Sequence, residues 1–422
     1  MDTITHGIAG ALFSKALFKG DDLFAMRSMN RQRVISWSVM LGAVFPDADT
    51  FRDLFSRNEL LMITWHRSIT HSLLCLPVFA LLLAVFTRWV ARWRKWDEPS
   101  FAALTGIYAA GILSHILLDL VTSFGTMVWS PLRWSRPAWD LIFIVDFTFT
   151  GILLVPQILA WVQERPEKIR RRALISLAIF ILAVFAVQAI GSAVGAMISP
   201  ATAFLFDVIL AALFLLPLRR NQKERPADSM AENGSTGAEN TSRDPSYLRW
   251  NQLGLVGACA YLGLAVLAHH TALGRVKDFA IMEKLEVQAL GALPFPPSLW
   301  KWDGLVRTPR GVYEVRLDLA DKSPFNTSPA VDPAERRAVE YRFYPEAYPN
   351  VYVEAARELP EVQKVLWFDR FPVTRFHEES GEQVVEFSDM RFPQIGRRRT
   401  PSFTYQVRFG PGGNVLSRGW VK

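Results

Sequence analysis

The segment 114–119 (SHILLD) places a histidine and a carboxylate inside an apolar run that begins at Phe101. If this run is helical, His115 and Asp119 are four residues apart and share one face, one turn from each other. Both side chains are costly to bury in an apolar segment unless a partner compensates them. A metal ion would do so, because imidazole and carboxylate are a common ligand pair for zinc and related cations. The alternative is a helix-capping aspartate and a histidine that is hydrogen-bonded to a neighbouring helix.

Three earlier segments carry the same residue types. Asp2 and His6 repeat the four-residue spacing, and the segment 46–49 (PDAD) places two carboxylates just after a predicted helix end. The segment 66–71 (HRSITH) supplies two more imidazoles with an arginine beside them. Several His and Asp ligands without cysteine are typical of a catalytic site in which one or two metal ions activate water. The predicted metal ligands are His6, Asp47, Asp49, His66, His71, His115 and Asp119.

Two side chains of this group have predicted catalytic roles. Asp49 is a candidate general base as well as a ligand, and Arg67 is suited to bind an anionic oxygen such as that of phosphate. The expected cofactor is a divalent metal ion, zinc first, with manganese or iron as alternatives. Each motif also has an interpretation without a metal. Asp2 would then cap the first helix, the two carboxylates of segment 46–49 would lie in an exposed turn, and the histidines of segment 66–71 would lie on a loop surface.

The composition indicates a membrane part joined to a soluble part. Of the 422 residues, 50% are hydrophobic and 21% are charged, which is too apolar for an ordinary soluble protein and too charged for a pure membrane bundle. The two cysteines, Cys75 and Cys259, lie in apolar runs, which argues against a disulfide framework and a thiolate zinc site. The net charge of +7 does not indicate nucleic acid, because Lys and Arg concentrate at the ends of apolar runs, as membrane topology requires.

The hydrophobic pattern predicts a mainly α integral membrane helical bundle with a small, mostly β, soluble C-terminal domain. Residues 1–218 would form the bundle that carries the His/Asp site, and residues 219–250 a disordered linker without apolar periodicity. A final transmembrane helix would cover 251–272. Residues 273–422 would form the β domain, because short alternating segments there are separated by turn signals. The apolar runs of the bundle are 3–18, 34–45, 73–90, 101–121, 141–162, 173–198 and 202–218, of which the first two are short for a full span.

The distribution of basic residues predicts which loops share a side of the membrane. The positive-inside rule assigns the basic loops to the cytoplasm, and these are 19–33, 88–98, 164–172 and 219–250. The segment 46–72, the loop 122–140 and the C-terminal domain then lie on the outer side of a bacterial inner membrane. All seven predicted ligands converge on that outer face. Either Asp140 or Asp146 could also meet them there, as a partner of a ligating histidine.

Taken together, these motifs resemble the YdjM-type family of bacterial membrane-bound metal-dependent hydrolases. The matching residues are Met1, Asp2, Thr5, His6, Gly7, Pro46, Asp47, Asp49, His66, Arg67, Thr70, His71, Ser72, Ser114, His115, Leu118, Asp119, Thr122 and Ser123. The resemblance covers roughly residues 1–160 and implies a hydrolase of unspecified substrate. The His-x-x-x-Asp pair is also similar to one in zinc-dependent phospholipases C and related single-strand nucleases, which favours a phosphoester bond.

Two functions from different classes follow. The first is a hydrolase in which metal-activated water attacks an ester, preferably a phosphoester, of a lipid, a lipid-linked molecule or another envelope component. Its partners would be membrane lipid and this substrate, with no nucleic acid. The alternative is a non-catalytic membrane scaffold with a structural metal site and a partner-binding C-terminal domain. An open coordination position at the metal would separate the two. A transporter is less consistent, because the charges gather at one face rather than at the midplane.

Overall fold

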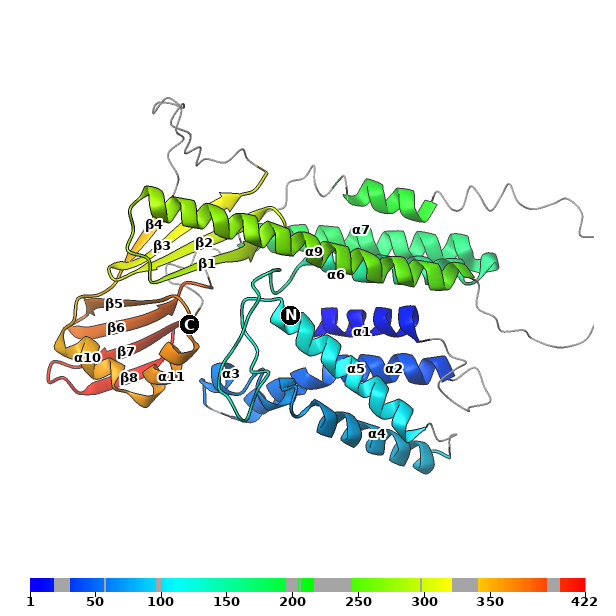
Figure 1. The fold of residues 1–422 in the computed structure, drawn as a ribbon, viewed down its shortest axis with the longest axis horizontal. Helices are drawn as coiled ribbons and strands as arrows, with labels where there is room; N and C mark the ends of the chain where they lie inside the picture. The colour runs from blue at the N-terminus through cyan, green and yellow to red at the C-terminus, as the bar shows by residue number, and fades with distance from the viewer. Residues whose placement is uncertain are drawn as a thin grey trace, which may run out of the picture.

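The computed structural model describes ten stretches of the chain. They are 1–18, 31–56, 58–95, 100–194, 204, 206–215, 245–296, 298–320, 341–392 and 403–421. The predicted fold class is confirmed: an N-terminal helical region is followed by a C-terminal region with two antiparallel sheets (Figure 1). The predicted disordered linker falls outside these stretches up to residue 244.

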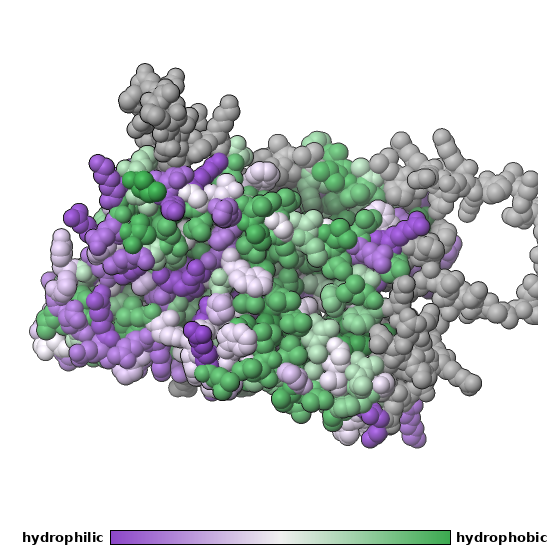
Figure 2. All heavy atoms as spheres, in the orientation of Figure 1, coloured by the Kyte–Doolittle hydropathy of each residue, from purple (hydrophilic) through white to green (hydrophobic). Residues whose placement is uncertain are grey.

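The helical region contains long helices joined by short helical turns. The long helices are α1 (Thr3–Leu17), α2 (Arg31–Val44), α4 (Leu76–Trp93), α5 (Phe101–Leu120), α6 (Phe147–Gln163), α7 (Ile169–Val194) and α9 (Pro245–Met282). The short ones are η1 (Phe45–Phe55), α3 (Leu61–Thr64), η2 (Ile69–His71) and η3 (Pro166–Lys168). Within the described stretches, four segments are long and apolar enough to cross a membrane, namely Leu76–Trp93, Phe101–Leu120, Ile169–Ala189 and Leu248–Met282. Together with the apolar surface over the helices in Figure 2, they make this a membrane protein.

The first two helices are shorter than a membrane is thick. α1 and α2 have 15 and 14 residues, or roughly 22 Å against about 30 Å of hydrocarbon. Helix α2 packs on α5 at very short range, through small residues. A Cβ built on Gly111 of α5 would lie 2.6 Å from the Val39 carbonyl oxygen and 3.0 Å from Gly42 Cα of α2. Such close approach is a common way of packing helices in lipid. It holds the end of α2 directly beside the end of α5.

Helix α9 links the membrane region to the first sheet. Its 38 residues extend roughly 57 Å, about twice the thickness of the hydrocarbon core, and continue beyond the predicted span 251–272. Its last third packs Ala272, Val276 and Phe279 against Trp302 and Val306 of the sheet. The helix therefore emerges from the bundle and becomes one layer of the C-terminal region.

In its described residues, the C-terminal region contains two four-stranded antiparallel sheets, each with its strands in sequence order. The first contains β1 (Ala289–Phe295), β2 (Lys301–Thr308), β3 (Gly311–Asp318) and β4 (Tyr341–Pro345). The second contains β5 (Pro372–Glu379), β6 (Glu382–Asp389), β7 (Thr404–Phe409) and β8 (Val415–Trp420), and is preceded by helices α10 (Val351–Arg357) and α11 (Pro360–Phe368). Hydrophilic side chains dominate the surface of this region in Figure 2.

The second sheet and the membrane bundle share one hydrophobic core. Val385, Phe387 and Phe409 of this sheet pack in the same cluster as Ile63 of α3 and Phe124 of the loop after α5. Because apolar side chains from both regions are removed from water together, the cluster fixes the sheet against these loops. The C-terminal region is therefore seated on the end of the bundle where α5 ends and α6 begins.

Asp303 on β2 makes the stability of this region depend on pH. Burial, and after it the neighbouring Glu314 carboxylate, raises the pKa of Asp303 to about 7, against about 3.9 in an unfolded chain. The folded state thus holds a proton that the unfolded chain has released, and stability falls as pH rises from about 4 to about 7. We expect Asp303→Asn to increase the free energy of unfolding by about 2–3 kcal/mol more at pH 8 than at pH 5.

Thermal unfolding of the detergent-solubilised chain at the two pH values measures this effect. Asp278→Asn, at an exposed position of α9, is the matched control and should leave the unfolding midpoint unchanged at both. An equal gain for Asp303→Asn at pH 5 and pH 8 would contradict the assignment.

Candidate metal centre

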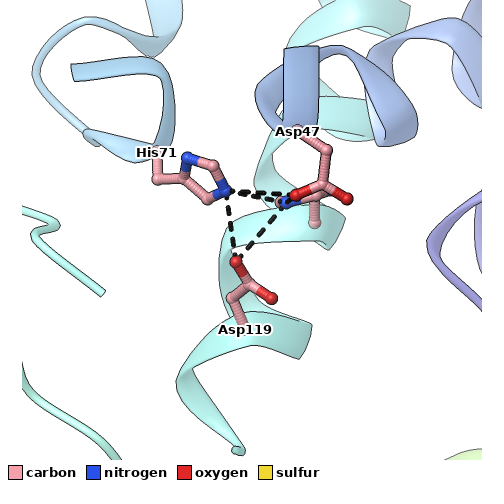
Figure 3. Close-up of side chains that lie close together, drawn as sticks. Asp47, His71 and Asp119 are labelled. Atoms are coloured by element: carbon pink, nitrogen blue, oxygen red, sulfur yellow. Dashed lines mark hydrogen bonds and ion pairs between the residues drawn. The ribbon is translucent and has the colours of Figure 1, made fainter. Parts of the chain in front are cut away.

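Four of the predicted ligands meet in the structure. Asp47, His71, His115 and Asp119 each offer one donor atom, these atoms lie within 4.8 Å of one another, and all four residues are buried. His71 Nε2 is 3.0 Å from His115 Nε2 and 3.2 Å from Asp119 Oδ2, and His115 Nε2 is 3.4 Å from Asp47 Oδ1. Figure 3 shows Asp47, His71 and Asp119 pointing toward one another. We refer to these four residues as the His/Asp cluster.

Three separate segments position the cluster. Asp47 follows Pro46 in the first turn of η1, directly after α2, and His71 is the last residue of η2. His115 and Asp119 lie one turn apart near the end of α5. Because α2 and α5 touch through glycine backbone, the turn after α2 arrives beside the last turns of α5.

Hydrogen bonds fix the orientation of both imidazoles. His115 Nδ1 donates to the backbone carbonyl of Ala43 at 2.6 Å, so its Nε2 keeps a lone pair that faces the cluster. His71 Nδ1 lies 3.0 Å from Thr70 Oγ1 and 3.5 Å from Asp49 Oδ2, and again Nε2 faces the cluster. An outer partner on one ring nitrogen with the other turned inward is the usual arrangement of metal-ligating histidines.

The two oxygens of Asp119 have different surroundings. Oδ1 accepts hydrogen bonds from the Met1 amino group at 2.5 Å, from Arg67 Nη2 at 2.9 Å and from His6 Nε2 at 3.1 Å. Oδ2 is buried and has no hydrogen-bond donor among the residues that the structure describes. It faces His71 and His115 instead. A buried oxygen without a donor is costly, and a cation beside it would compensate that cost.

The two carboxylate oxygens of Asp47 also have different surroundings. Its Oδ2 accepts from Thr3 Oγ1 at 2.6 Å, while its Oδ1 faces both histidines of the cluster. Burial alone would raise the pKa of Asp47, but the adjacent imidazoles of His115 and His71 outweigh burial and hold the pKa well below its usual range. The carboxylate is thus ionised, as a metal ligand must be. Two carboxylates and two imidazoles form a donor set that fits a divalent metal ion.

The other three predicted ligands lie beside the cluster and outside the group of four donors. His6 is stacked on His115, with ring centroids 3.6 Å apart, and donates to Asp119 as described. His6 thus supports both Asp119 and His115 by direct contact. Asp2, four residues before His6, accepts a hydrogen bond from Thr5 N at 2.9 Å and so caps α1, as its alternative interpretation predicted.

Asp49 and His66 form a pair at the edge of the cluster. His66 Nδ1 lies 2.9 Å from Asp49 Oδ1, and Asp49 Oδ2 accepts from Arg67 N and Thr70 Oγ1. Burial favours a higher pKa for Asp49, but the hydrogen bond from His66 and the nearby His71 lower it overall. The side chains of His66 and Asp49 are 17% and 12% exposed, against 0–8% in the cluster. This pair is therefore the part of the site nearest to solvent.

Arg67 is directed at Asp119. Its side chain is 2% exposed, its Nη2 donates to Asp119 Oδ1 at 2.9 Å, and its Nη1 donates to Thr122 Oγ1 at 3.0 Å. The backbone of Arg67 has φ +61°, a conformation that a non-glycine residue adopts only when its surroundings hold it there. Its role as a substrate anion site stays a prediction.

Two further aspartates do not contact the site histidines. Asp140 forms a bidentate ion pair with Arg370 of the C-terminal region, at 2.9 and 2.8 Å. Asp146 caps α6 and accepts a hydrogen bond from the Tyr261 hydroxyl. Sequence reasoning did not identify the supporting groups Thr3, Thr122 and the Ala43 carbonyl. Thr122 could have been identified, because it lies in the motif that follows Asp119. The Ala43 carbonyl could not, because every residue has a backbone carbonyl and the sequence does not show which one accepts a hydrogen bond.

The part of the chain that carries this site is similar to a known protein family. No curated protein and no solved structure was found to match the chain. One family model, described as YdjM inner membrane protein, matches residues 1–193. This stretch includes the whole His/Asp cluster, with His6, Asp49, His66 and Arg67 around it. The resemblance drawn from the sequence motifs is thereby confirmed for residues 1–193, which match the model of the YdjM inner membrane protein family.

Proposed function

We propose that the protein is a membrane-bound metal-dependent hydrolase with its metal ion held by Asp47, His71, His115 and Asp119. One observation carries the proposal: Asp119 Oδ2 is buried, lacks a hydrogen-bond donor among the described residues, and faces two imidazole nitrogens. Nitrogen and oxygen donors without sulfur suit zinc, with manganese or iron as alternatives. A divalent ion bound there supplies positive charge that polarises an ester and lowers the pKa of water.

The chain's own residues would handle the proton. Asp49 already accepts three hydrogen bonds, and its pKa is lowered, so it is a weak base. Its position on His66 Nδ1 is that of a carboxylate that orients an imidazole. No hydrogen bond to His66 Nε2 occurs within the described part of the chain, and the side chain of His66 is the most exposed of the seven predicted ligands. We therefore assign proton transfer to His66 and its orientation to Asp49.

The location of the site supports an amphiphilic substrate. The cluster lies near the end of α5, a candidate span that ends at Leu120, so it lies near the membrane surface. Next to the edge formed by Asp49 and His66, η1 exposes Phe51 and Phe55, which are 63% and 89% exposed. Apolar side chains beside a polar edge fit a molecule with a lipid part and a phosphoester head group. We place this reaction at the outer face of the inner membrane, with the C-terminal domain on the same side.

The first test is metal content together with hydrolysis. The purified wild-type protein should contain stoichiometric metal by elemental mass spectrometry and should hydrolyse phospholipid vesicles or bis(p-nitrophenyl) phosphate. His66→Gln is expected to keep the metal and to reduce the rate by about 10²–10⁴-fold, the usual contribution of a general base. A wild-type rate in this variant would contradict the assigned role of His66, and a wild type without metal would overturn the proposed function.

A structural metal site is the second candidate, and one observation favours it. The cluster offers four buried protein donors, which is the number that closes a structural zinc site, whereas catalytic zinc usually has three. Cobalt(II) substitution distinguishes the two. An open site would change its visible absorption spectrum when azide is added, because azide would occupy a coordination position. A closed site would not respond, and the protein would then be a scaffold whose C-terminal domain binds a partner.

A further inference from the structure

Arg67 packs on an aromatic ring that also belongs to the core of the C-terminal region. The ring is that of Phe124, and Arg67 Cζ lies 5.0 Å from its centroid. Phe124 is 4% exposed and packs against Phe368, Phe392 and Phe403, with ring centroids 5.2, 6.1 and 6.2 Å away. Phe124 thus touches the metal site on one side and the C-terminal region on the other.

From this ring, guanidinium and aromatic groups alternate into the C-terminal region. Arg136 Cζ lies 4.9 Å from the Phe124 centroid and 5.3 Å from the Phe368 centroid. Arg391 Cζ lies 4.6 Å from Phe368 and 5.1 Å from Phe392. We call this series the cation–π ladder, and its members are Arg67, Phe124, Arg136, Phe368, Arg391 and Phe392.

Hydrogen bonds hold each guanidinium group of the ladder in place. Arg136 donates to the backbone carbonyls of Ile63, His66 and Gly125 at 2.7, 3.1 and 3.1 Å. Of these three carbonyls, that of His66 directly precedes Arg67 in the chain. Arg391 donates to the Phe368 carbonyl and, across the interface, to the Ser123 carbonyl, which directly precedes Phe124. Arg136 of the loop after α5 thus holds the backbone beside Arg67, and Arg391 of the C-terminal region holds the backbone beside Phe124.

We propose that the C-terminal domain helps to form the metal centre. The cation–π ladder positions Arg67 and, through Arg67, the ligand Asp119. Arg67 donates to Asp119 Oδ1, and this contact leaves Oδ2 facing the histidines. The positive φ of Arg67 must be maintained by its surroundings, and Phe124 with the carbonyl contacts of Arg136 provides them. Phe124 and Phe368 are therefore positioning residues. The inference rests on the proposed metal centre but not on the proposed hydrolysis.

Metal affinity in the full-length protein tests this coupling. Phe124→Leu should weaken zinc binding about 10-fold or more in a chelator competition, because loss of a partner outside the ligand set typically costs 10–100-fold. Phe368→Leu, one step further along the ladder, should weaken it in the same direction. The visible spectrum of the cobalt(II) form should change in both variants, since the carboxylate of Asp119 would be reoriented.

Phe409→Leu is the matched control. Phe409 is 1% exposed and lies in the same hydrophobic cluster as Phe124 and Phe368, but no contact joins it to the guanidinium groups of the ladder in the described structure. It should lower the unfolding midpoint and leave zinc affinity and the cobalt spectrum unchanged. If the three variants lose stability alike and all keep wild-type affinity and spectra, the coupling is refuted while the metal centre stands. If the wild type itself binds neither zinc nor cobalt, the proposed function fails first.

Discussion

Replacing His115 with alanine is expected to remove the bound metal while the helical bundle stays folded. His115 would contribute Nε2 as one of four donors, and its Nδ1 is already committed to the Ala43 carbonyl. Losing a direct ligand should cost more than the 10–100-fold that follows loss of an outer partner. The variant also removes the imidazole that lies beside both Asp47 and Asp119, so that the two carboxylates are left with His71 as the remaining histidine of the cluster. Elemental mass spectrometry of variant and wild type, purified side by side, measures the effect.

Two further histidine variants make the result specific. His377→Ala changes a histidine of β5 in the second sheet that is not part of the His/Asp cluster, and it should keep the full metal content. His6→Ala removes a donor to Asp119 Oδ1 and a stacking partner of His115, so it should weaken the metal by about 10–100-fold without abolishing binding. Metal content in His115→Ala equal to that of the wild type would show that the cluster is not the metal site.

The site could be predicted from sequence as far as spacing and topology reach. His115 and Asp119 share a helical face because they are four residues apart, and charged residues at the ends of apolar runs predict which loops meet. These two arguments bring together residues from segments 46–49, 66–71 and 114–119, and the structure places all of them within one site. Spacing and topology do not distinguish the metal ligands from the residues that support them. That distinction depends on which oxygen of Asp119 accepts hydrogen bonds. Met1, Arg67 and His6 all donate to Oδ1, which leaves Oδ2 for the metal.

The contribution of the C-terminal region was not predictable in this way. Phe124 and Phe368 are 244 residues apart, and neither belongs to a periodic pattern that would mark a shared core. Alternating segments correctly indicated strands after residue 273, but the short helices α10 and α11 have no apolar run long enough to stand out. The final transmembrane helix was predicted to end at residue 272, whereas α9 continues to Met282. Its last turns pack on the first sheet, a contact that the hydrophobic pattern of the sequence does not identify.

Adding a single methyl group to Gly111 is expected to disturb the metal centre from a distance. A Cβ at this position of α5 would lie 2.6 Å from the Val39 carbonyl oxygen and 3.0 Å from Ala43 N, and backbone atoms cannot rotate out of the way. Helices α2 and α5 must therefore separate, which should cost about 1–3 kcal/mol of stability, as overpacking does. The shift acts directly on the Ala43 carbonyl that orients His115, and on Asp47 four residues later. We expect Gly111→Ala to lower both the unfolding midpoint and zinc affinity.

The same substitution at Gly106 on the same helix provides the comparison. Among the described residues, no heavy atom outside the adjoining helix backbone lies within 4 Å of a Cβ built there, so Gly106→Ala should bind zinc like the wild type and should be equally or slightly more stable. The contrast isolates the contact between α2 and α5, because residue type, helix and substitution are identical. If both variants kept wild-type zinc affinity, the cluster would not depend on the close approach of the two helices. If Gly111→Ala alone loses zinc, the glycine contact is part of what brings Asp47 to His115, and the short helix α2 serves the site by its fixed position against α5.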